Sequence, residues 1–219
     1  MKKRKTNTPP PKLKSKKYRG FILQIPNIGM GLFIFFYVIA ALEYPGGSWN
    51  LPNTNGFSFW NNYLCDLLDT NAINGELNTA RFFARISLAI LCASLLLLWN
   101  KLPRFFKQPS TNKKIMWLSG NLALGITFFL TSGTHDITIR IAGFFGVIAF
   151  VTCFIELYKT EKYSLLSFGV ICLMIFLANY LIYETQLFIH SLPIIQKVTF
   201  ILFLIWFYVL NKTVYKKLV

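Results

Sequence analysis

The chain has 219 residues, of which 54% are hydrophobic and only 14% are charged. Soluble domains carry about 25% charged residues, so this composition excludes that class. The 22 Phe, 10 Tyr and 5 Trp exclude a disordered chain, which lacks such apolar groups. The net charge is nevertheless +15, from 23 Lys and Arg against 8 Asp and Glu. This combination predicts an integral membrane protein with basic ends.

The segment 1–20 is rich in Lys and Pro and has no apolar periodicity, which predicts a disordered basic tail in the cytoplasm. Basic tails bind either nucleic acid or anionic lipid. No aromatic residue lies among these charges before Tyr18, so we expect contact with membrane lipids and no nucleic-acid partner.

Residues 21–212 contain six apolar runs, and a helix needs about 20 such residues to cross a bilayer. The runs cover residues 21–42, 82–99, 115–131, 137–157, 165–183 and 193–210. No alternating strand pattern competes with them, so the expected fold class is all-α, a polytopic bundle of six transmembrane helices. Residues 213–219 form a second, short basic tail.

Small residues recur every four positions in the third run, at Ser119, Ala123 and Thr127. A similar stripe, from Ala142 to Cys153, follows in the fourth run. Small side chains let transmembrane helices approach closely. We therefore expect the third and fourth helices to pack against each other as an antiparallel pair.

The basic residues are distributed unevenly between the two sides of this six-span arrangement. The two tails with the adjoining Lys212, and the connections 101–114 and 159–162, hold 19 of the 23 Lys and Arg, and all of these segments lie on one side. Cytoplasmic segments carry such an excess. The pattern predicts a multi-pass protein of the cell (inner) membrane with both termini in the cytoplasm.

The one long connection is the predicted outer loop, residues 43–80. Its turn signals are Tyr44–Gly47 and the pairs Asn55-Gly56 and Asn74-Gly75. Between them, residues 57–68 have helical periodicity, which predicts a short amphipathic helix on the mouth of the bundle. Long loops are often functional, so this loop is either a binding site or a plug that seals the bundle.

Candidate ligand-binding residues lie near the outer edge of the spans. Arg81 and Arg85 are spaced i, i+4, so they share a helix face and form a candidate clamp for a phosphate or a carboxylate. The alternative is that they pair with acids of the loop. Four further side chains are positioned to orient a lipid headgroup or small anion in an outward-facing polar cavity: Asn62, Asp66, Tyr180 and Tyr183. Structural hydrogen bonding between helices is their alternative role.

A second hypothesis is an outward-facing hydrolase or transferase. Its candidate catalytic residues are His135, His190, Asp66 and Glu184, with a histidine acting as base. Asp136 has a structural explanation, because Arg140 lies one turn further along and can pair with it. With two histidines and no C-x-x-C pair, we predict no metal site and no cofactor. A third hypothesis is an accessory subunit whose loop docks a membrane protein partner.

Several of these segments resemble a known family. Tyr44-Pro45-Gly46-Gly47-Ser48, the stretch Asn61–Leu67 and the pair His135-Asp136 are similar to a group of uncharacterised bacterial membrane proteins. That group looks like a branch of the domain-of-unknown-function 998 family, and the resemblance covers residues 22–212. It implies a six-span topology and draws attention to the outer loop, but it implies no activity.

Overall fold

The computed structural model describes residues 12–106, 110–130 and 135–218. It is all-helical, with no strand among these residues, which confirms the all-α prediction. The six α-helices are α1 Lys12–Leu42, α2 Arg81–Lys101, α3 Thr111–Thr127, α4 His135–Lys159, α5 Tyr163–Thr185 and α6 Leu192–Leu218. The described residues also include the 3-10 helices η1 Cys65–Leu68, η2 Leu102–Arg104 and η4 Ile189–Ser191.

Five of these helices are long and apolar enough to cross a membrane, namely α1, α2, α4, α5 and α6. The helix α3 has 17 residues and a length of about 26 Å, which is less than the roughly 30 Å of a hydrocarbon core. The predicted third span ran to Thr131, and the segment 131–134 lies outside the described residues.

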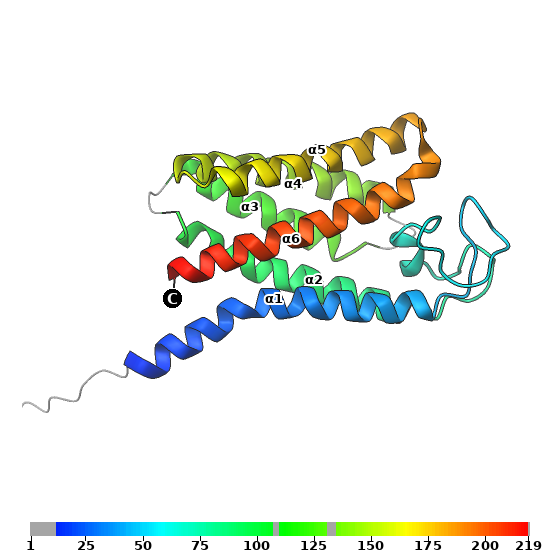
Figure 1. The fold of residues 1–219 in the computed structure, drawn as a ribbon, viewed down its shortest axis with the longest axis horizontal. Helices are drawn as coiled ribbons and strands as arrows, with labels where there is room; N and C mark the ends of the chain where they lie inside the picture. The colour runs from blue at the N-terminus through cyan, green and yellow to red at the C-terminus, as the bar shows by residue number, and fades with distance from the viewer. Residues whose placement is uncertain (1–11, 107–109, 131–134, 219) are drawn as a thin grey trace, which may run out of the picture.

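Successive helices run in opposite directions along one long bundle (Figure 1). The segment 43–80 lies at one end of the bundle, and the C-terminal end of α6 lies at the other. We call these the loop end and the basic end, since α6 finishes with Lys216 and Lys217. Contacts are most extensive between α3 and α4, which confirms the predicted pairing, and between α1 and α2.

Aromatic side chains fill the core. Phe150 of α4 lies at its centre, with ring centroids 5.2 Å from Trp206 and 6.2 Å from Trp99. Two glycines make room for the indoles, because a Cβ at Gly120 would lie 1.9 Å from Trp99 and one at Gly169 would lie 2.7 Å from Trp206. These contacts bring the middle of the bundle to close packing.

The structure differs from the prediction at the start of the chain. The helix α1 begins at Lys12, so residues 12–20, which the sequence places in a disordered tail, are helical. Lys, Leu and Arg are good helix formers, and extending an existing apolar helix needs no new nucleus. Residues 1–11 lie outside the described part of the chain.

The predicted amphipathic helix over residues 57–68 is wrong. Only Cys65–Leu68 is helical, as the 3-10 turn η1. Side chains compete for the backbone here: the Asn62 Oδ1 accepts from the Ser58 N–H, and the Asp66 Oδ2 accepts from the Tyr63 N–H, both at 2.8 Å. Such local bonds replace the hydrogen bonds of a helix.

Candidate functional site

The segment 43–80, which we call the cap, is a packed unit. Asn62 is fully buried at its centre and bonds through both ends of its amide. In addition to accepting from Ser58, it donates to the Gly47 carbonyl at 2.6 Å and to the Asp66 carboxylate at 3.0 Å. One side chain thus joins three parts of the cap.

Asn78 is a second buried amide. Its Nδ2 donates to the carbonyls of Asp66, Leu67 and Asp69, at 2.9–3.2 Å. The N-cap residue of α2 is Ala80, which makes no side-chain cap bond. Asn78 therefore fastens η1 to the last residues of the cap.

Residues near the start of α6 bond to the cap. The buried Lys197 donates to the carbonyls of Asn62 and Pro193, and its ammonium lies 5.2 Å from the centre of the Phe59 ring. The neighbouring Gln196 accepts from the Leu64 N–H at 2.8 Å. The cap is thereby joined to α6 as well as to the ends of α1 and α2.

Burial raises the pKa of the Asp66 carboxyl to about 6, against the lowering effect of its bonds to Asn62 and Tyr63. A raised carboxyl pKa stabilises the fold at low pH. This contribution is fully present below about pH 4 and is lost as the pH rises through about 6.

We therefore expect the protein to be about 2 kcal/mol more stable at about pH 4 than at about pH 7.5 through this group, which thermal unfolding in detergent measures. Asp66→Asn should remove this part of the pH dependence. An unchanged pH profile in that variant would show that another group is responsible.

Arg81 and Arg85 point to the cap without pairing to its acids. Arg81 donates to the Thr70 carbonyl at 3.1 Å, and Arg85 donates twice to the Leu68 carbonyl, at 3.1 and 3.3 Å. Neither arginine takes part in an ion pair among the described residues. Burial raises the pKa of Asp69, while the nearby His135 and Arg85 act to lower it.

The start of α4 and the end of α5 share a polar cluster. His135 Nδ1 lies 3.0 Å from the Asp136 carboxylate, to which the Tyr183 hydroxyl also donates, at 3.1 Å. The expected pair of Asp136 with Arg140 is not formed. Arg140 instead bonds Glu184 at 2.9 Å, because α5 brings a second carboxylate within its reach.

The four candidate catalytic residues belong to separate groups of contacts. His190 bonds Asn50 at 2.7 Å, Asp66 lies inside the cap, and Glu184 pairs with Arg140. Only His135 combines a carboxylate partner with a buried ring nitrogen, Nε2, that has no hydrogen-bond partner. The described residues contain no group of three or more His, Cys, Asp and Glu placed to hold a metal ion.

The candidate ligand-binding residues also lie in separate places. Asn62 and Asp66 are 0% and 4% exposed, so they hold the cap together from within. Tyr180 and Tyr183, at 43% and 39%, face outward on α5. The sequence did not predict that Asn78 bonds three carbonyls of the cap. The one signal for it was that Asn78 lies among other polar residues of this loop.

These features define a helical protein with several helices able to cross a membrane and a packed polar cap at one end. Comparison with protein-family models, with curated proteins and with solved structures found no match. The resemblance to the domain-of-unknown-function 998 family therefore stays a prediction.

Proposed function

We propose that the protein is a membrane-embedded binding protein that takes a lipid headgroup or small anion at its loop end, through Arg81 and Arg85. The observation that carries this proposal is that both guanidinium groups are held by carbonyl oxygens. A carbonyl fixes the position of a guanidinium but leaves its positive charge in place, whereas a carboxylate would neutralise it.

The geometry leaves donors for a ligand. A guanidinium has five N–H groups, and bidentate binding of phosphate or carboxylate uses two of them. Arg81 uses one N–H in the cap and Arg85 uses two. The two side chains lie one helical turn apart on α2, at the level where the cap meets the bundle.

We also propose that all six helices cross the membrane, with the basic end in the cytoplasm. The alternating directions of the helices support six crossings, and α1 begins at the end where α6 finishes (Figure 1). The excess of Lys and Arg at that end supports the orientation. Arg81 and Arg85 then face the outer side of the bacterial inner membrane.

The test is anion binding by the full chain in nanodiscs. The double variant Arg81→Gln, Arg85→Gln should bind phosphatidylglycerol or added inorganic phosphate about 30-fold more weakly, since two charges each contribute roughly 1 kcal/mol. Arg140→Gln is the matched control, because Glu184 already neutralises that charge.

Two outcomes are decisive. Binding that is unchanged in the double variant would refute the proposal. Binding that is lost in the double Gln variant and returns only in part in Arg81→Lys, Arg85→Lys, with an unchanged unfolding temperature, would support it, since lysine keeps the charge but lacks the fork geometry.

A further inference from the structure

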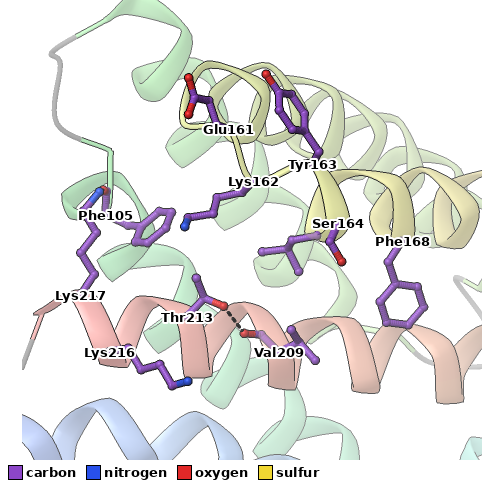
Figure 2. A pocket seen from close by; sticks show the side chains of 11 residues that line it. Phe105, Glu161, Lys162, Tyr163, Ser164, Phe168, Val209, Thr213, Lys216 and Lys217 are labelled. Carbon is purple, nitrogen blue, oxygen red and sulfur yellow. Dashed lines mark hydrogen bonds between the residues drawn. The ribbon is translucent and has the colours of Figure 1, made fainter.

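A second candidate site lies at the opposite, basic end of the bundle. There the structure has a cavity of about 750 Å³ between the first turn of α5, the last turns of α6 and Phe105 (Figure 2). Pockets that hold small organic ligands have volumes of about 300–1,000 Å³. The cavity is therefore large enough for a phospholipid headgroup with its glycerol.

Lysine ammonium groups line one part of this cavity. Lys162 extends into it from the start of α5, and Lys216 lies on the α6 side (Figure 2). Neither ammonium donates a hydrogen bond within the described ranges, and both residues line the space. Lys217 is used differently: it donates to the Phe105 carbonyl at 2.7 Å and covers the Phe105 ring.

Polar groups near the lysines add donors. Ser164 lines the same space and adds a hydroxyl, whereas the Thr213 hydroxyl already donates to the Val209 carbonyl at 2.8 Å (Figure 2). The helix α5 begins here with no side-chain cap on its N-terminal residue, Lys162, and the first N–H groups of a helix favour an anion. The single lining carboxylate, Glu161, points away from the Lys162 amine (Figure 2).

The rest of the lining is apolar. Leu165, Phe168 and Val209 lie further along α5 and α6, toward the middle of the bundle, whereas the lysines lie at its end. This gradient from charged to apolar matches a phospholipid, whose phosphate stays at the membrane surface while its acyl chains enter the hydrocarbon. A free phosphate would gain nothing from the apolar part.

We infer that this cavity binds an anionic phospholipid of the cytoplasmic leaflet, with its phosphate held by Lys162 and Lys216. The site is separate from the one proposed at Arg81 and Arg85, and it depends on different residues. It uses the membrane orientation given above, in which the basic end faces the anionic cytoplasmic surface.

The experiment is native mass spectrometry of the full chain released from micelles that contain phosphatidylglycerol or phosphatidylethanolamine. The variant Lys162→Gln, Lys216→Gln should lower phosphatidylglycerol affinity by about 30-fold. The control Lys114→Gln, Lys212→Gln removes the same charge from exposed positions outside the cavity. Those charges are screened by solvent and make no bond to the phosphate, so the affinity should change by less than about threefold.

A second variant tests the cavity without changing charge. Ser164→Trp places an indole in the space and should also abolish retention of phosphatidylglycerol, with helix content and unfolding temperature checked in parallel. Binding that survives this variant, or that falls equally in the control pair, would overturn the inference.

Two further measurements are needed. One distinguishes a lipid phosphate from free phosphate, and the other distinguishes the two proposed sites. If inorganic phosphate displaces the bound lipid as effectively as a short-chain phosphatidylglycerol does, the phospholipid assignment is overturned. Loss of one bound lipid in the Lys162→Gln, Lys216→Gln variant, with the Arg81- and Arg85-dependent binding retained, would support two independent sites.

Discussion

Replacing Asn62 by Ala is expected to lower the free energy of unfolding by about 3–5 kcal/mol, one of the two largest effects that the structure predicts. The change leaves three partners without their bonds to Asn62: the half-buried Ser58 N–H and the buried Gly47 carbonyl and Asp66 carboxylate. Each unsatisfied buried group costs about 1–3 kcal/mol. Thermal unfolding in detergent and limited proteolysis of the cap measure the loss.

The neighbouring Asn61 supplies the control. It donates one partly buried bond to the Ser58 hydroxyl at 2.9 Å, so Asn61→Ala should change the stability by less than about 1 kcal/mol. Equal effects of the two substitutions would mean that the cap does not depend on the buried amide. Cleavage within residues 43–80 only in Asn62→Ala would locate the damage in the cap.

The second large effect is expected for Trp206→Ala. Trp206 is fully buried, packs against Phe150 and Phe154, and donates to the Leu165 carbonyl at 2.9 Å. Removing an indole from a close-packed core leaves a cavity and costs about 3–5 kcal/mol. The unfolding transition should fall accordingly, and phosphatidylglycerol retention should fall with it, because Leu165 also lines the cavity at the basic end.

Two substitutions serve as comparisons. Trp206→Phe keeps most of the packing and loses the hydrogen bond, so we expect a loss of about 1–2 kcal/mol. Trp117→Ala removes an indole that is 43% exposed on α3 and should cost less than Trp206→Ala. A destabilisation by Trp117→Ala as large as that by Trp206→Ala would contradict the assignment of the core.

Helical periodicity and apolar length predicted the helices well, because a run that must satisfy its own backbone in lipid has few alternatives. The boundaries of the long loop were also predicted, since Leu42 ends α1 and Arg81 begins α2. The interior of that loop was not. The apolar spacing of residues 57–68 indicated a helix, but buried Asn and Asp side chains took the backbone donors instead.

The partners of the polar residues were the least predictable part. Spacing along one helix indicated a pair between Asp136 and Arg140, yet Glu184 comes from a different helix. Likewise, the sequence indicated the loop acids as alternative partners for Arg81 and Arg85. Both arginines bond carbonyl oxygens instead, and a backbone carbonyl carries no signal in a sequence. Contacts between distant segments depend on packing that one sequence does not specify.

The helix α6 has 27 residues, and a helix of that number is about 40 Å long. Near its start, Lys197 and Gln196 are bonded into the cap. Near its end, Thr213 and Lys216 line the cavity of the basic end. One continuous helix thus connects the loop end with the basic end. Moving α6 along its axis would therefore break the cap bonds at one end of the bundle and change the lining of the cavity at the other.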